Sequence, residues 1–295
     1  MNKTDYITPI VTPLTAAGEL DETGLEALVN YIIEGGVSGI LALGSIGEFF
    51  AFPSEFKKRL IADTVKFAAG RVPVLAGVSG TVLSEIEDLG KFALKAGAHA
   101  IISVPPYYFP HTQRDIYLFY SRLSKLGPTY LYNFPDRTGY SIDAETVLKI
   151  KRDCPSVLGI KDTLSGVDHT REIIKAVKGE FPEFKVYSGF DDNLARNVLS
   201  GGDGCIAGLS NALPEFCARW ARALTNNDLS EAASCQKICD RLMDIYNVGK
   251  PFVPFIKAAT RLMGVNITTR CSFPMPEVSK ADESKILSII QSAGV

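Results

Sequence analysis

The stretch Val157-Leu158-Gly159-Ile160-Lys161-Asp162-Thr163 is a short apolar run that ends abruptly in a lysine. A turn signal, Asp153-Cys154-Pro155-Ser156, precedes it, and a helical pattern begins near Val167 after it. Together these features predict a strand, a loop and a helix, with Lys161 at the last position of the strand. Because the run is apolar throughout, we expect a strand of a parallel sheet whose two faces are covered by helices.

The same alternation of strand and helix patterns continues along the first 225 residues and gives eight units in all. Eight such units predict an α/β fold, a closed (β/α)8 TIM barrel, over residues 1–225. Only helical patterns follow Asn227, so residues 226–295 should form a C-terminal helical appendage packed on the barrel. A doubly wound open sheet is the alternative, but the early glycine loop lacks its G-x-G-x-x-G spacing. The predicted strands cover residues 6–13, 39–43, 72–77, 100–104, 129–133, 157–161, 185–188 and 204–207.

The bulk composition narrows the classes of function. The chain has 295 residues, 46% hydrophobic and 22% charged, as in a globular protein. Its formal net charge of -2 gives no strong field for nucleic acid or an anionic membrane. We find no secretory leader and no apolar run of about 18 residues, and the six cysteines are scattered as reduced thiols are. We therefore expect a cytoplasmic protein that acts on a small molecule, with no nucleic-acid or membrane partner.

Active sites of (β/α)8 barrels lie at the C-terminal ends of the strands, and two predicted strand ends carry reactive side chains. Lys161 ends the sixth strand, and Tyr132 lies at the end of the fifth. Neighbouring strands are about 4.8 Å apart, so this amine and this phenol could reach one substrate carbon. Partial removal from water favours the neutral amine, which can attack a ketone and form a Schiff base, while the phenol relays protons. The alternatives are an exposed lysine that ends a strand and a tyrosine that only packs.

Polar residues follow the other predicted strands as well. The loop Gly44-Ser45-Ile46-Gly47 lies between a strand and a helix, so its main-chain N–H groups could bind a carboxylate; a plain tight turn is the alternative. No histidine stands at a strand end, so the pattern supports neither a metal-activated water nor a Ser-His-Asp triad, and we predict no metal site. The remaining strand-end candidates are Thr8, Thr12, Tyr107, Tyr108, Asn133, Arg137, Thr163, Ser188, Gly189, Asp191, Asp192, Gly208, Ser210 and Asn211.

Three segments, taken in order, resemble the dihydrodipicolinate synthase / N-acetylneuraminate lyase superfamily of class I pyruvate aldolases. They are Gly44-Ser45-Ile46-Gly47-Glu48, Tyr132-Asn133-Phe134-Pro135 and Gly159-Ile160-Lys161-Asp162-Thr163. The likeness extends over the whole chain, including the helical C-terminus. It implies a Schiff base between Lys161 and a pyruvate-type 2-oxo acid, with Tyr132 as the proton shuttle.

The resemblance also implies how the rest of the site and the assembly are built. The main chain of Ile46 and Gly47 would hold the carboxylate of the 2-oxo acid. Ser45 would link Tyr132 to a tyrosine of the partner subunit, for which Tyr108 is a better candidate than Tyr107. The implied assembly is a homotetramer, a dimer of dimers, that uses no metal and no organic cofactor.

The choice of substrate within this superfamily depends on a few positions. Ile46 replaces a hydroxyl that synthases use in their proton relay, whereas Arg137 stands where synthases bind the carboxylate of a semialdehyde. The segment Gly189-Phe190-Asp191-Asp192 resembles the lyases and the 2-keto-3-deoxygluconate aldolases, in which acidic side chains meet substrate hydroxyls. Gly208 has no hydroxyl where neuraminate lyases tend to have a serine.

We therefore expect a lyase that makes or breaks a C–C bond next to a pyruvate-derived enamine, with a 2-keto-3-deoxy sugar acid as its preferred substrate. Three alternatives stay open: dihydrodipicolinate synthase, N-acetylneuraminate lyase, and a non-catalytic 2-oxo acid binder. The expected catalytic residues are Lys161, Tyr132, Ser45 and Tyr108, and the expected substrate-binding residues are Ile46, Gly47, Arg137, Thr163, Gly189 and Asp191.

Overall fold

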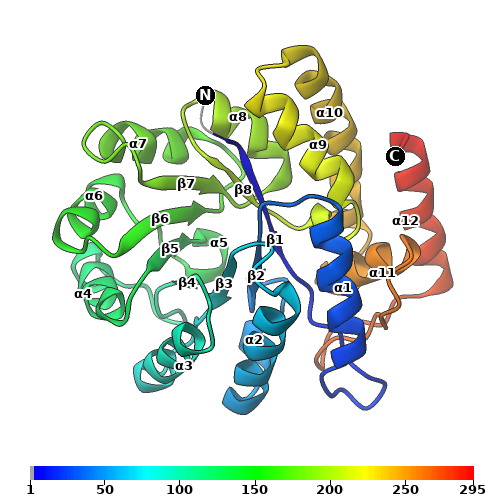
Figure 1. Cartoon of the computed structure of the whole chain (residues 1–295), viewed down its shortest axis with the longest axis horizontal. Coiled ribbons are helices and arrows are strands. Elements are labelled where there is room, and N and C mark those ends of the chain that lie inside the picture. The colour runs from blue at the N-terminus through cyan, green and yellow to red at the C-terminus, as the bar shows by residue number, and fades with distance from the viewer. Residues whose placement is uncertain (1–2) are drawn as a thin grey trace.

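The computed structural model describes residues 3–295, and its centre is a closed barrel of eight parallel strands (Figure 1). The strands are β1 (Asp5–Pro9), β2 (Gly39–Ala42), β3 (Val74–Gly77), β4 (Ala100–Ser103), β5 (Thr129–Asn133), β6 (Val157–Asp162), β7 (Lys185–Ser188) and β8 (Gly204–Ile206). Each strand pairs with the next along the chain, and β8 pairs with β1 to close the barrel. The prediction of a (β/α)8 TIM barrel is confirmed. β6 ends at Asp162, one residue later than predicted.

Helices surround the strands and appear as an outer ring in Figure 1. They are α1 (Glu22–Glu34), α2 (Ser54–Ala68), α3 (Leu83–Lys95), α4 (Gln113–Leu123), α5 (Pro135–Thr138), α6 (Ala144–Asp153), α7 (Asp168–Val177), α8 (Leu194–Leu199) and α9 (Pro214–Thr225). Short 3₁₀ helices follow four strands or helices: η1 (Phe49–Ala51), η2 (Ser124–Leu126), η3 (Asp191–Asn193) and η4 (Leu209–Asn211). The sequence did not predict α5, the single turn after β5 that carries Arg137.

Helix α1 illustrates why the outer helices form where they do. The carboxylate of Asp21 accepts a hydrogen bond from the N–H of Gly24 and so caps the first turn. Leu25, Leu28 and Ile32 recur at helical spacing, and all three are buried against the barrel. Burial of each such side chain contributes about 1.5–3 kcal/mol relative to exposure, so this one face is enough to dock the helix.

The C-terminal residues form helices only, as predicted. They are α10 (Leu229–Leu242), η5 (Met243–Asn247), α11 (Val253–Leu262) and α12 (Lys280–Ala293). Figure 1 shows α11 and α12 together at one side of the barrel, and the two helices pack against each other. The division into a barrel over 1–225 and an appendage over 226–295 stays a prediction, because α9 packs against α10 across it.

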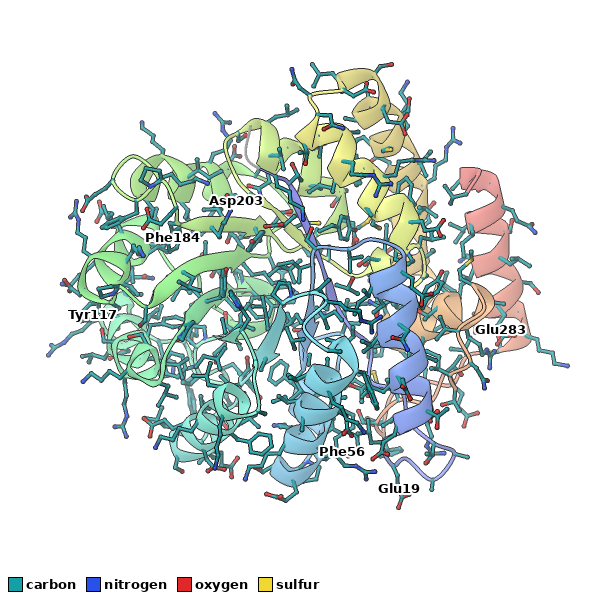
Figure 2. The ribbon with its side chains drawn as sticks, viewed as in Figure 1. Glu19, Phe56, Tyr117, Phe184, Asp203 and Glu283 are labelled. Atoms are coloured by element: carbon teal, nitrogen blue, oxygen red, sulfur yellow. The ribbon has the colours of Figure 1, made fainter. Side chains whose placement is uncertain are left out.

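A charged cluster binds the strands together at the N-terminal end of the barrel. Asp203, labelled in Figure 2, is buried just before β8. Its carboxylate accepts hydrogen bonds from the Nζ atoms of Lys178 (2.6 Å) and Lys185 (3.1 Å) and from the N–H of Val186 (2.9 Å). Polar networks at this end of such barrels serve stability, whereas chemistry belongs to the opposite end.

No helix among residues 3–295 combines the length and the apolar character that a membrane crossing requires.

Candidate active site

Lys161 and Tyr132 meet at the C-terminal end of the barrel. They lie on the neighbouring strands β6 and β5, in direct register with each other. The Nζ atom of Lys161 is 4.4 Å from the centroid of the Tyr132 ring. Lys161 is 4% exposed and Tyr132 is 3% exposed. Among residues 3–295, no carboxylate forms an ion pair with Lys161, so its amine is withdrawn from water without a compensating anion.

Ser45 extends the contacts of Tyr132 toward the loop after β2. The Ser45 hydroxyl lies 3.3 Å from the Tyr132 hydroxyl, a distance at which either group can donate. Ser45 is partly exposed at the edge of the pocket. A hydroxyl in this position can pass a proton between Tyr132 and a group outside the barrel.

The glycine loop after β2 offers main-chain hydrogen-bond donors. The N–H of Gly47 donates to the carbonyl oxygen of Gly44 (3.0 Å) and closes a tight turn, so it is not free. Within residues 3–295, the N–H groups of Ser45 and Ile46 have no such acceptor. Ser45 and Ile46 therefore have the free main-chain N–H groups in this part of the described chain, and the binding of the carboxylate by the main chain of Ile46 and Gly47 stays a prediction.

Glu48, directly after this loop, forms an ion pair that the sequence analysis missed. Its backbone is left-handed (φ 58°), and its side chain is fully buried. The carboxylate accepts hydrogen bonds from the Nζ of Lys257 (2.7 Å) and from both the N–H and the hydroxyl of Ser272 (2.7 Å each). Lys257 also donates to the carbonyl oxygen of Arg270 (2.6 Å). The glycine loop is thus attached to α11 and to the segment that follows α11.

Thr163 and Gly189 lie against each other in the pocket wall. A Cβ atom on Gly189 would lie only 1.8 Å from the Thr163 hydroxyl oxygen, so only glycine allows this contact. The Thr163 hydroxyl is buried and has no hydrogen-bond partner among residues 3–295. A buried hydroxyl without a partner is costly, which makes it a candidate to bind substrate.

Asp191 is present in the pocket wall, but its carboxylate is already occupied. It is 1% exposed, one oxygen accepts from the Tyr6 hydroxyl and from the N–H of Leu209 (2.9 Å), and the other accepts from the Tyr246 hydroxyl (2.7 Å). Burial raises the pKa of Asp191, and the hydrogen bonds from Tyr6 and Tyr246 oppose that rise. Asp192 beside it is half-buried, and burial raises its pKa too.

Arg137 and Tyr108 are both exposed, and Arg137 lines the pocket. Arg137 lies over the ring of Phe134 (5.5 Å from its Cζ to the ring centroid), and it forms no ion pair within residues 3–295. Tyr108 is 86% exposed, with φ 101° in the left-handed region. Such a backbone costs on the order of 1–3 kcal/mol for a residue with a side chain. Tyr107 instead turns inward against Phe49, with ring centroids 6.2 Å apart.

These side chains line one pocket of about 410 Å³ at the C-terminal end of the barrel. A pocket of this size can enclose a small ligand. Eight of the ten predicted site residues line it, and Tyr108 and Gly47 do not. The eight are Lys161, Tyr132, Ser45, Ile46, Arg137, Thr163, Gly189 and Asp191, and Gly208 and Tyr246 line the pocket beside them.

Next to Lys161 in the chain, Asp162 forms a pair with the partly buried His169 that the sequence analysis missed. The Nδ1 atom of His169 is 3.1 Å from both carboxylate oxygens of Asp162, and its Nε2 is 3.0 Å from the carbonyl oxygen of Ile142. Both ring nitrogens therefore face acceptors, which favours the imidazolium form. Burial alone would lower the pKa of His169, but the hydrogen bond and charge of Asp162 outweigh it, and the pKa is raised.

This pair predicts a pH dependence of stability. A histidine whose pKa is raised by folding adds stability that is fully present below the unfolded pKa, about 6.5, and is lost as pH rises through the folded pKa. As the pH rises from the unfolded pKa of His169 to its folded pKa, we expect the free energy of unfolding to fall in the natural protein. It should fall less in His169→Gln. Urea titrations at several pH values measure both slopes. His99→Gln, which changes an exposed histidine, should leave the slope as it is; an equal slope in His169→Gln would contradict the assignment.

Comparison with known proteins gives the family. The model of the Dihydrodipicolinate synthetase family matches residues 2–293, so the chain belongs to this family. The predicted resemblance is confirmed, and with it, at the level of the family, the prediction of a lyase of the class I aldolase type that acts on a 2-oxo acid.

Individual relatives are similar over almost their whole length. "Probable 2-dehydro-3-deoxy-D-pentonate aldolase YjhH" of Escherichia coli K12 is 33% identical over 98% of this chain and 97% of its own. The 4-hydroxy-tetrahydrodipicolinate synthase of Kosmotoga olearia is 31% identical over 97% of each chain. The crystal structure of YagE from Escherichia coli K12 in complex with pyruvate superimposes with a TM-score of 0.96 at 32% identity, and covers 100% of this chain and 99% of that one.

Proposed function

We propose that this protein is a class I aldolase that cleaves or forms 2-keto-3-deoxy sugar acids through a Schiff base on Lys161. One observation carries the proposal: a buried amine without an anionic partner lies 4.4 Å from the ring of a buried tyrosine, inside a pocket. This is the arrangement that covalent catalysis by an amine requires.

The proposed reaction begins when Nζ of Lys161 attacks the C2 carbonyl of the substrate. Loss of water gives the protonated Schiff base, which withdraws electrons from C3. Tyr132, which gave its proton to the C2 oxygen that left as water, takes the proton of the C4 hydroxyl. The C3–C4 bond then breaks, and an aldehyde leaves while C3 remains as an enamine. Tyr132 would carry the proton that C3 gains next, in exchange with Ser45, and hydrolysis returns pyruvate and free Lys161.

The pocket supplies groups for the remainder of the 2-oxo acid. The free N–H groups of Ser45 and Ile46 would bind the carboxylate, because backbone donors in a glycine loop form an anion site. The unpartnered hydroxyl of Thr163 would form a hydrogen bond with the part of the substrate beyond C3. Arg137, exposed at the mouth, would hold a distal carboxylate in any substrate that has one.

Two features favour a sugar acid as the substrate. YjhH, a relative at 33% identity, is described as an aldolase of a 2-dehydro-3-deoxy-pentonate. Ile46 places an apolar side chain at the position where the synthases of the resemblance use a hydroxyl. Dihydrodipicolinate synthase is the second candidate, because Arg137 is free of any carboxylate among residues 3–295 and could bind that of a semialdehyde.

The test is pyruvate release from 2-keto-3-deoxypentonate, 2-keto-3-deoxygluconate and N-acetylneuraminate, beside condensation of pyruvate with aspartate semialdehyde. Faster cleavage of the deoxy sugar acids supports the proposal. Faster condensation with the semialdehyde would make the protein a synthase instead. A borohydride adduct with pyruvate but no turnover of any compound would make it a 2-oxo acid binder.

Removal of the Tyr132 hydroxyl should slow the reaction strongly. We expect Tyr132→Phe to lower kcat by about 10²-fold or more, the usual range for a lost general acid or base, because the ring keeps its packing while the proton carrier is gone. Steady-state pyruvate release measures this. Tyr117→Phe is the matched control, since its hydroxyl donates to the carboxylate of Asp153 (2.8 Å) outside the pocket. Near-normal turnover in Tyr132→Phe would exclude the phenol as the carrier.

The assembly and location are part of the same proposal. The exposed, strained Tyr108 is placed to contact another molecule, and we propose that it reaches Ser45 of a second copy within a homotetramer. We propose a cytoplasmic location, which the free cysteines fit.

A further inference from the structure

Tyr246 enters the pocket from outside the barrel. It belongs to η5, in the C-terminal helical region, and lines the same pocket as Lys161. A Cβ atom built on Gly208 would lie 2.6 Å from the Tyr246 hydroxyl oxygen and 2.5 Å from Cδ1 of Ile46. The tyrosine hydroxyl and the isoleucine side chain therefore occupy the space that a larger residue at position 208 would need.

The hydrogen of the Tyr246 hydroxyl has a defined direction. It points to Asp191, whose carboxylate accepts it at 2.7 Å. The other carboxylate oxygen accepts from Tyr6 and from the N–H of Leu209, so every neighbour of this carboxylate is a donor. A tyrosine whose hydrogen is committed in this way offers only its oxygen lone pairs to the pocket. Tyr246 is thus held as a hydrogen-bond acceptor.

Tyr246 also remains a neutral phenol. Burial raises its pKa well above the ordinary value, and the nearby charge of Asp191 raises it further. Asp191 is buried, and both of its carboxylate oxygens already accept hydrogen bonds. It can therefore influence a bound ligand only through the hydroxyl of Tyr246.

We infer that Tyr246 is a specificity-determining residue that accepts a hydrogen bond from a hydroxyl of the aldehyde half of the substrate, and that Asp191 is a positioning residue that fixes its direction. This inference rests on the proposed function and adds the group that selects the substrate. A hydrogen-bond acceptor stabilises the binding of a chain that carries hydroxyls. It adds no affinity for an alkyl chain and weakens the binding of a carboxylate. Tyr246 replaces Asp191 as the predicted contact to substrate hydroxyls.

The experiment compares two aldehydes of equal length in condensation with pyruvate, D-glyceraldehyde and propanal, which differ in their hydroxyls. In the natural protein we expect a higher kcat/KM for glyceraldehyde. In Tyr246→Phe that value should fall by about 3- to 10-fold, the range for one neutral hydrogen bond, mainly through KM, while the value for propanal changes by less than about 2-fold. Asp191→Asn should change the ratio in the same direction, because an amide can donate to the phenol and reverse its role.

Controls separate this inference from loss of fold and from failure of the proposed function. Tyr31→Phe removes a hydroxyl that donates to the carbonyl oxygen of Ala212 outside the pocket, and should keep the natural ratio. Borohydride trapping of pyruvate on Lys161 should persist in every variant, whereas its absence in the natural protein would refute the proposed function instead. The inference is refuted if trapping persists and Tyr246→Phe lowers kcat/KM equally for both aldehydes, or for neither.

Discussion

Replacing Lys161 with methionine should abolish turnover and prevent any borohydride adduct with pyruvate. Methionine has a similar volume but no amine, so the pocket is kept while the covalent intermediate is lost. We expect kcat to fall by about 10⁴-fold or more, because loss of the nucleophile in a covalent hydrolase costs about 10⁶-fold. Pyruvate release measures the rate, and peptide mass spectrometry after borohydride reduction locates the adduct.

Lys57 provides a control for the assignment of Lys161 as the lysine that forms the Schiff base. Burial lowers its pKa, so it is the lysine on α2 that could compete for a carbonyl. Lys57→Met should keep both turnover and the adduct, because this amine lies outside the pocket. An adduct found on the peptide of Lys57, or an adduct that survives Lys161→Met, would remove the central assignment.

The second large effect concerns stability and comes from the pair between Glu48 and Lys257. Both side chains are fully buried, and the Nζ to carboxylate distance is 2.7 Å. Lys257→Met leaves the carboxylate of Glu48 without a cation in the interior. Breaking a buried pair in this way costs about 3–5 kcal/mol. We expect a loss of this size in the free energy of unfolding, measured by chemical denaturation.

The double variant Glu48→Gln/Lys257→Met tests the mechanism of that loss. It removes both charges, and glutamine can still accept a hydrogen bond from Ser272. We expect it to be more stable than Lys257→Met alone, because no unpaired charge stays buried. As a surface comparison, breaking the exposed pair of Lys149 and Asp153 with Lys149→Met should cost at most about 1 kcal/mol. A loss equally small in Lys257→Met would contradict the account.

The barrel and the reactive pair could be predicted because their signals are local. An apolar run that ends in a lysine identifies β6, and the fixed geometry of parallel strands brings Tyr132 alongside Lys161. The roles of Ser45, Thr163 and Asp191 depend on loops, whose turns the sequence does not define. The hydrogen bond within the glycine turn, for example, uses the N–H of Gly47 and leaves that of Ile46 free.

Other contacts could not be predicted, because they join residues that are far apart in the chain. Lys257 falls within an ordinary helical pattern, and nothing near it reveals that its partner lies 209 positions earlier. The same holds for Tyr246, which reaches Asp191 across 55 positions. His169 does not stand at a predicted strand end, yet α7 places it against Asp162 of the preceding strand.

The attachment of the glycine loop to α11 has a consequence for synthesis of the chain. A nascent polypeptide released from the ribosomal tunnel as far as β8 can already form eight strands, but Glu48 then has no cation to neutralise it. Lys257 and Ser272 emerge only after all eight strands have been released. The enzyme should therefore mature late, and a premature stop before codon 257 should yield an inactive product even where the barrel itself assembles.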